Sequence, residues 1–144
     1  MKFIYLYALM LVAIFAGCAK ENNTPTIILD EMIRSDFATA SNLKYTGNFS
    51  NGPYGTVAGT AKIYLQENKY TLSFENIAVS NGPDLHVYLS REMQPLTFID
   101  LGKLKSTQGN QLYDVTGLPD FSQYTYVLIH CQQYNHLFGS AALK

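Results

Sequence analysis

Cys131 is the residue of this chain whose type and neighbours best suit chemistry. It lies in the stretch YVLIHCQQYNHLFGSAAL, from Tyr126 to Leu143, with His130 before it and His136 after a short polar loop. Cysteine and histidine are metal ligands, and a thiolate can also exchange electrons. Because adjacent strand residues point to opposite faces, His130 and Cys131 cannot both bind one ion unless a bulge intervenes. His136 is the easier partner for Cys131.

Two interpretations of Cys131 remain open from the residues alone. A free cysteine behaves as a small hydrophobe, and Cys131 shares a strand face with Val127 and Ile129, which suits a place in the core. A redox thiol or an iron ligand would instead need exposure and a lowered pKa. A metal site would also need a further ligand from another strand, and His86 or Asp84 could supply it.

The sequence argues against several other kinds of chemistry. It contains no nucleophile elbow, phosphate-binding loop, His-Glu-x-x-His motif, aspartate-rich calcium loop or paired-cysteine zinc motif. A net charge of −1 provides no basic surface for nucleic acid. We therefore expect a non-enzymatic protein rather than a hydrolase or a nucleotide-dependent enzyme. The remaining carboxylates lie near turns, where aspartate commonly caps the backbone, namely Asp84, Asp100, Asp114 and Asp120.

The N-terminus has the pattern of a bacterial lipoprotein signal. An apolar run from Phe3 to Phe15 is too short for a comfortable membrane span and ends in FAGC at residues 15–18, a lipobox-like ending without the usual first leucine. The sequence predicts a signal peptide over residues 1–17 and lipidation of Cys18, with an ordinary secretory signal as the alternative. Lipidation would leave Cys131 without an intramolecular disulfide partner.

Lipidation also predicts how the mature protein is held. Acyl chains contribute about 0.8 kcal/mol per buried methylene, so several chains tether a protein firmly to a membrane that it does not span. Ala19 stands where aspartate would favour inner-membrane retention, so the outer membrane of a bacterial cell envelope is the predicted location. Residues 18–44 are expected to be the tether, flexible over Lys20–Thr26 and with a possible short helix within Ile27–Leu43.

The elements that must position Cys131 are short strands. Tyr70–Glu75 alternates apolar and polar residues, and we expect it to form a hairpin with Thr60–Leu65 through the tip Gln66–Lys69. Leu85–Ser90 places Leu85, Val87 and Leu89 on a core face, with His86 and Tyr88 on the face expected to meet solvent. Eleven tyrosines and no tryptophan suit a pleated surface. The sequence predicts an all-β fold over residues 45–144, an antiparallel β-sandwich of about seven to nine strands. The other expected strands are Tyr45–Phe49, Thr60–Leu65, Phe98–Leu101, Tyr113–Val115, Tyr126–Cys131 and Leu137–Leu143.

Three segments of this region point to a known family. They are NGPDLHVYLS at residues 81–90, DLGKLK at residues 100–105 continuing through 109–111, and VLIHC at residues 127–131 with LFGSA at 137–141. Together they resemble the DM-thirteen domain family, which is also called electron-transfer DM-thirteen. The positions that carry the family motif are Gly82, Pro83, Asp84, Leu85, His86 and Gly139.

The resemblance implies a secreted or membrane-tethered β-sandwich in which Cys131 matches the single characteristic cysteine of the family. That cysteine is proposed to act in redox chemistry as a bare thiol or as a ligand to a prosthetic group such as haem. The resemblance implies haem or a metal as the cofactor, and with His86 and His136 added from the residue pattern the candidate cofactor-binding set is Cys131, His86 and His136. A lone thiol cannot cycle through an internal disulfide, so redox work would need a partner thiol, a sulfenic acid or a bound metal centre.

Two functions are therefore expected to compete. The first is a cell-envelope lipoprotein that takes part in redox or electron transfer through Cys131. The second is a non-catalytic β-sandwich module that binds a protein or glycan with its tyrosine-rich strands and the loop Asn81–Asp84, with Cys131 as part of the core. They differ in whether the sulfur faces a pocket or the core.

Overall fold

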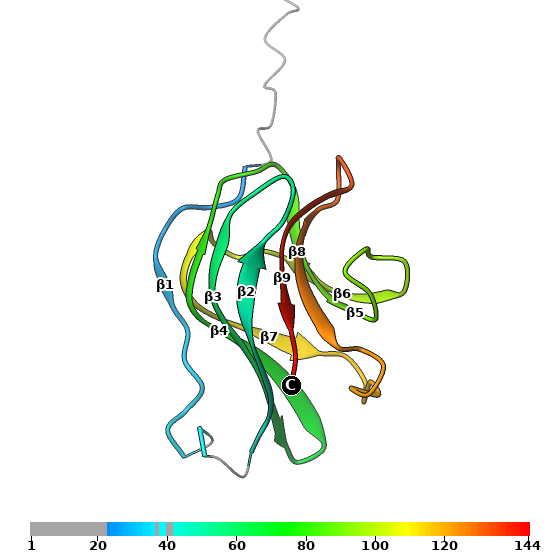
Figure 1. The fold of residues 1–144 in the computed structure, drawn as a ribbon. Coiled ribbons are helices and arrows are strands. Elements are labelled where there is room, and N and C mark those ends of the chain that lie inside the picture. The colour runs from blue at the N-terminus through cyan, green and yellow to red at the C-terminus, as the bar shows by residue number, and fades with distance from the viewer. Residues whose placement is uncertain (1–22, 37, 40–41) are drawn as a thin grey trace, which may run out of the picture.

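The computed structural model describes residues 23–36, 38–39 and 42–144, and these form a single curled sheet of nine strands (Figure 1). The predicted signal peptide over residues 1–17 and Cys18 lie outside the described residues. The strands follow the spatial order β1-β7-β4-β3-β2-β9-β8-β5-β6. Their bounds are β1 Leu29–Asp30, β2 Leu43–Asn51, β3 Val57–Gln66, β4 Lys69–Val79, β5 Leu85–Ser90, β6 Phe98–Lys103, β7 Gln108–Val115, β8 Tyr126–Cys131 and β9 His136–Ala142.

The prediction of an all-β fold is confirmed, and the two halves of the sheet are joined by β2. The first part of β2 pairs with β3, whereas its last residues, Phe49–Asn51, pair with β9. A two-sheet sandwich was expected, but β2 is long enough to serve both halves and makes the sheet continuous. All neighbouring strands run antiparallel except β1 and β7, which are parallel.

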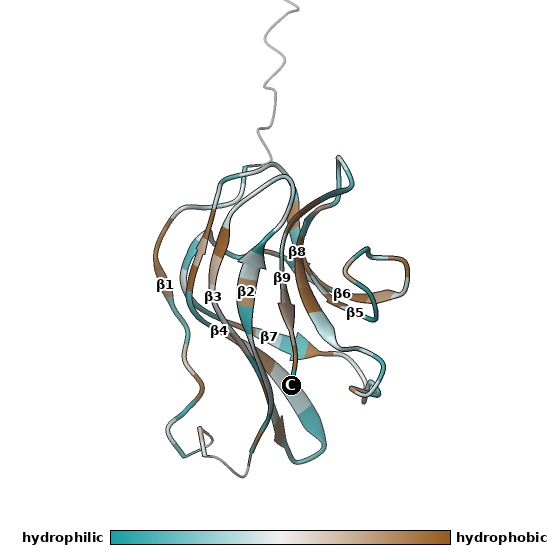
Figure 2. Ribbon diagram, viewed as in Figure 1, coloured by the Kyte–Doolittle hydropathy of each residue, from teal (hydrophilic) through white to brown (hydrophobic). Residues whose placement is uncertain are grey.

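The main core lies inside the curl of the sheet and follows the predicted alternation. Leu72 and Phe74 of β4 face it, as do Leu85, Val87 and Leu89 of β5, so the predicted register of β5 is confirmed. Figure 2 shows hydrophobic colour along these central strands. Burying one such side chain contributes about 1.5–3 kcal/mol to stability. This inward face of β5 and β8 also receives Cys131.

The hairpin predicted between β3 and β4 is present, and its strands are joined by a two-residue turn. Gln66 pairs with Lys69, and the two residues between them, Glu67 and Asn68, have φ angles of 46° and 62°. Positive φ at both central positions is the type I′ turn, whose twist matches that of the flanking strands. The hairpin therefore fixes the register of the two longest strands.

The described start of the chain is docked on the domain, so the prediction of a flexible tether over Lys20–Thr26 is wrong for residues 23–26. Asn23 forms an isolated bridge with Pro83, and the buried Thr24 donates a hydrogen bond to the carbonyl of Gly82 at 3.3 Å. The carbonyl of Pro25 accepts a bond from the backbone N–H of Thr107 at 2.8 Å. These contacts pair backbone groups that a free tether would leave to water.

The short helix predicted within Ile27–Leu43 is not found in the described part of that segment. Leu29–Asp30 pairs with β7 instead, and the Glu31 N–H donates to the carbonyl of Asn110 at 3.0 Å. The Glu31 side chain accepts the Leu112 N–H at 2.9 Å. Within the described residues, no helix has the length and hydrophobicity to span a membrane.

Candidate functional site

Cys131 ends β8 and lies in the core. It is directly opposite Leu85 on β5 and His136 on β9, and only 1% of it is exposed. Its Sγ donates a hydrogen bond to the carbonyl oxygen of Pro83 at 2.9 Å. Within the described residues it is the one free cysteine. In this conformation the thiol is closed to solvent.

The loop Asn81–Asp84 covers the thiol, which gives the predicted family motif a structural role. A Cβ built at Gly82 would lie 2.6 Å from Cζ of Phe138, so only glycine lets the loop lie flat on that ring. Asp84 has a φ of 55°, and its carbonyl accepts the N–H of Gln132 at 3.0 Å. The loop is thereby tied to Cys131 and to the residue that follows it.

His86 lies on the opposite face of the sheet from Cys131. Because Leu85 is the cross-strand partner of Cys131, the next residue of β5 points away from the sulfur. The Nδ1 atom of His86 lies 3.0 Å from a carboxylate oxygen of Asp100, and its Nε2 lies 3.4 Å from Oδ1 of Asp84 without a hydrogen bond. Lys103 approaches the same Asp84 oxygen at 3.0 Å and lowers the pKa of that carboxyl group.

His130 is the cross-strand partner of His86 and shares this outer face. Its ring stacks on Tyr88 at 5.3 Å between centroids, and Tyr88 in turn stacks on Phe98 at 4.2 Å. His130 is 4% exposed and Tyr88 2% exposed, and burial raises the pKa of the Tyr88 hydroxyl. The sequence argument treated this face as solvent, which is wrong. β5 gives no local signal of this burial, because His86 and Tyr88 alternate with its core residues as they would on an exposed face.

His136 is next to Cys131 across the strands, but its ring is engaged elsewhere. It lies flat on Tyr54, with ring centroids 3.7 Å apart and an interplanar angle of 2°. The predicted ligand set of Cys131, His86 and His136 is therefore not assembled. Among the described residues no group of three or more His, Cys, Asp or Glu side chains is placed to hold a metal ion. These residues do not fit haem or a metal at Cys131.

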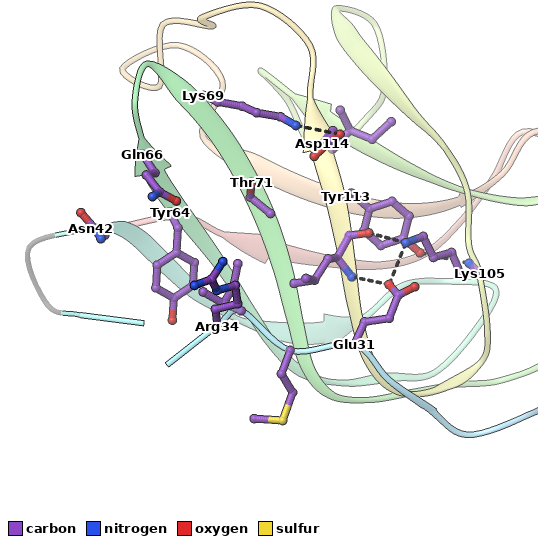
Figure 3. Close-up of a pocket in the computed structure, with 14 residues that line it drawn as sticks. Glu31, Arg34, Asn42, Tyr64, Gln66, Lys69, Thr71, Lys105, Tyr113 and Asp114 are labelled. Carbon is purple, nitrogen blue, oxygen red and sulfur yellow. Dashed lines mark hydrogen bonds and ion pairs between the residues drawn. The ribbon is translucent and has the colours of Figure 1, made fainter. Parts of the chain in front are cut away.

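A large cavity lies remote from the thiol. It has a volume of about 770 Å³ and lies between residues 31–34 and the outer face of β3, β4 and β7 (Figure 3). Ion pairs cross its wall between Lys69 and Asp114 at 3.0 Å and between Lys105 and Glu31 at 2.7 Å. Burial alone would raise the pKa of Glu31. The hydrogen bonds from Lys105 and from the Leu112 N–H together have the larger effect, so the pKa of Glu31 is lowered. The remaining charged group of the lining, Arg34, is paired with Asp36 at 2.9 Å, so the charges of the cavity already have partners.

The fold and the site together define a class, an all-β domain with one buried cysteine beneath a glycine-proline loop. The family model described as Electron transfer DM13 matches residues 48–143, and the chain belongs to this family. The resemblance predicted from the sequence is thereby confirmed. No curated protein and no solved structure matches the chain.

Acidification is expected to destabilise the fold first through His130. Burial lowers the pKa of His130 from its ordinary value of 6.5, and the nearby His136 and His86 lower it further, against a bond with Asn135 that raises it. The unfolded chain therefore binds a proton on His130 at higher pH than the folded protein does. The contribution of His130 to the free energy of unfolding is fully present above pH 6.5 and is lost as the pH falls through the pKa of the folded state. Urea unfolding across that window measures the slope.

A His130→Gln variant supplies the control for this pH dependence. Asp84 and Glu31 also have lowered pKa values, but their ordinary values of 3.8 and 4.5 place their contribution at lower pH. The variant should keep that lower acid transition and show a smaller slope just below pH 6.5. An unchanged slope would assign the effect to other groups.

Proposed function

We propose that the protein is a lipid-anchored protein of the bacterial cell envelope that takes part in redox or electron transfer through Cys131. The observation that carries the proposal is the family match over residues 48–143, which includes this cysteine. The lipobox-like residues 15–18 support the anchor, and the outer membrane is the proposed location. No cofactor is part of the proposal, because Cys131 and His86 lie on opposite faces of the sheet.

The geometry around the thiol limits how such chemistry proceeds. Cys131 is sealed by the loop Asn81–Asp84 and hydrogen-bonded to Pro83, so an exchange partner reaches the sulfur only after this loop moves. Thiol–disulfide exchange then needs a thiol or disulfide from a second molecule, because the other cysteine of the chain, Cys18, is the proposed lipid site. Loops open at lower free energy than a whole domain unfolds.

The test is the rate at which iodoacetamide labels Cys131 in the folded, lipidated protein as a function of low urea concentration. Local opening of Asn81–Asp84 exposes little surface, so the labelling rate should depend only weakly on urea, whereas labelling through global unfolding follows the full equilibrium slope. A Cys131→Ser variant shows the background from other sites. Labelling that follows global unfolding alone would contradict a redox role for this thiol.

The anchor has a separate test in the native host. Labelled palmitate should enter the full-length protein and should not enter a Cys18→Ala variant. Equal incorporation in both would remove Cys18 as the lipid site.

A second function is favoured by the 1% exposure of Cys131. In this alternative the domain is a non-catalytic module that binds a protein or glycan at the envelope, and the cysteine only fills the core. Cys131→Ser should then lower the free energy of unfolding by about 1–3 kcal/mol and leave partner binding unchanged once the variant is folded. A Cys131→Ser variant that folds normally but loses function in the cell would favour the redox role.

A further inference from the structure

The described chain begins at the end of the domain where three connections meet. Figure 1 shows the β2–β3 and β4–β5 connections and the β8–β9 hairpin gathered at the end where residue 23 lies. Asn23 is bridged to Pro83, and Tyr54 of the first connection stacks on His136, which follows the hairpin. We call residues 23–25, 51–56, 80–83 and 132–135 the anchor end.

The link between the proposed lipid site and the anchor end is short, so it keeps the anchor end close to the membrane. Five residue steps separate Cys18 from Asn23, and Asn23 is held on the domain. A fully extended chain spans at most about 3.6 Å per residue, so this link reaches no more than about 18 Å. The anchor end therefore stays within about 18 Å of the proposed lipid site, whatever path the link takes.

The anchor end has the composition of a surface that meets lipid headgroups. Residues 23–28, 50–57, 79–83 and 131–140 contain no Asp, Glu, Lys or Arg. Asp84, just beyond this end, is paired with Lys103 at 3.0 Å. The opposite end carries charges at the hairpin tip, such as Glu67 and Lys69. Contact with headgroups at the anchor end would strip water from few charges, which is the costly part of burying a polar surface.

Two exposed tyrosines project from this uncharged end. Tyr54 is 57% exposed and Tyr134 is 54% exposed. The ring of His136 lies between them, 3.7 Å from the Tyr54 centroid and 5.9 Å from the Tyr134 centroid. Tyrosine concentrates at membrane interfaces because its ring is apolar and its hydroxyl group is polar. Stacking on His136 holds the Tyr54 ring in place before any contact is made.

We propose that the anchor end is a membrane-contact surface on which Tyr54 and Tyr134 lie at the headgroup level of the bilayer. The proposal rests on the lipid anchor at Cys18 and adds an orientation to it. The domain stands with its β2–β3 and β8–β9 connections on the lipid and its β3–β4 hairpin away from it. The loop Asn81–Asp84 over Cys131 consequently faces the membrane.

The absence of tryptophan from the chain makes the orientation measurable. Tyr54→Trp and Tyr134→Trp each introduce a single tryptophan at the proposed surface. Leu118→Trp is the matched control, because Leu118 is 64% exposed on the β7–β8 connection at the opposite end. The full-length lipidated variants are reconstituted in phosphatidylcholine vesicles with or without a spin label on the headgroup. We expect loss of fluorescence for the first two variants and none for the control.

The outcomes separate this inference from the anchor on which it rests. Palmitate labelling and flotation with vesicles are measured on the same samples. Lipidated, vesicle-bound protein with no quenching at either tyrosine position would overturn the contact surface and leave the anchor intact. Equal quenching at all three positions would overturn the orientation. A protein that incorporates no palmitate would overturn the anchor, and the contact surface with it.

Discussion

Gly139→Ala is expected to lower the free energy of unfolding by about 1–3 kcal/mol, the usual cost of overpacking a well-filled core. Gly139 lies in β9 opposite Ile129, and both neighbouring strands approach it closely. A Cβ at this position would lie 2.5 Å from Cγ2 of Val57 and 2.8 Å from the carbonyl oxygen of Ser50. Because one of these atoms belongs to the backbone, a rotamer change alone cannot relieve the contact. Urea unfolding of the full-length protein measures the loss.

A double-mutant cycle with Val57→Ala tests this explanation. Val57 is 3% exposed, and shortening it alone leaves a cavity beside Gly139. In the double variant the new methyl group enters that space, so the combined loss should be smaller than the sum by about 0.5–3 kcal/mol. Strictly additive losses would mean that contact with Val57 is not the cause.

The sequence predicts the strands of this fold well because alternate residues of a strand face the main core. The alternation in β5 placed Leu85, Val87 and Leu89 in the core, and the residues between Gln66 and Lys69 indicated the hairpin. These are local signals, since each depends on the two faces of one strand or on the φ angles of one turn. The family resemblance was likewise visible in three short segments of the sequence, and the match over residues 48–143 confirms the family.

The sequence could not predict features that depend on distant pairing. Nothing local shows that Thr24 bonds to Gly82 or that Leu29 pairs with Gly109, so the segment looked like a tether with a helix. The closed outer face was missed for the same reason, because Phe98 covers Tyr88 from a different strand. Sequence spacing alone gives no information about such contacts.

The position of His86 relative to Cys131 could not be predicted because the pairing register of β5 and β8 is not visible in the sequence. Parity separated His130 from Cys131, but the same rule could not be applied to His86 without knowing its partner strand. In the structure Leu85 pairs with Cys131, so His86 lies on the other face of the sheet. What remains of the predicted site is the thiol itself and the loop that covers it.

Phe138→Ala is expected to have the largest effect, a loss of about 3–5 kcal/mol in the free energy of unfolding. Phe138 is 6% exposed in β9, and its ring fills the space where side chains at Gly55 and Gly82 would lie. It therefore packs between the β2–β3 connection and the loop over Cys131. Removing the ring should loosen that loop as well as the core, so iodoacetamide should label Cys131 faster in the folded state.

Phe121→Ala separates loosening of the loop from general loss of stability. Phe121 is 5% exposed and packs between Tyr45 and Tyr70, with centroid distances of 4.8 and 4.7 Å, on the β7–β8 connection away from the thiol. Both variants lose a buried phenyl ring, so both should unfold at lower urea concentration. Only Phe138→Ala should label Cys131 rapidly with a weak dependence on urea, because only its ring supports the covering loop. If both variants label Cys131 only as fast as they unfold, the loop is not a separate opening unit and the thiol is a structural part of the core.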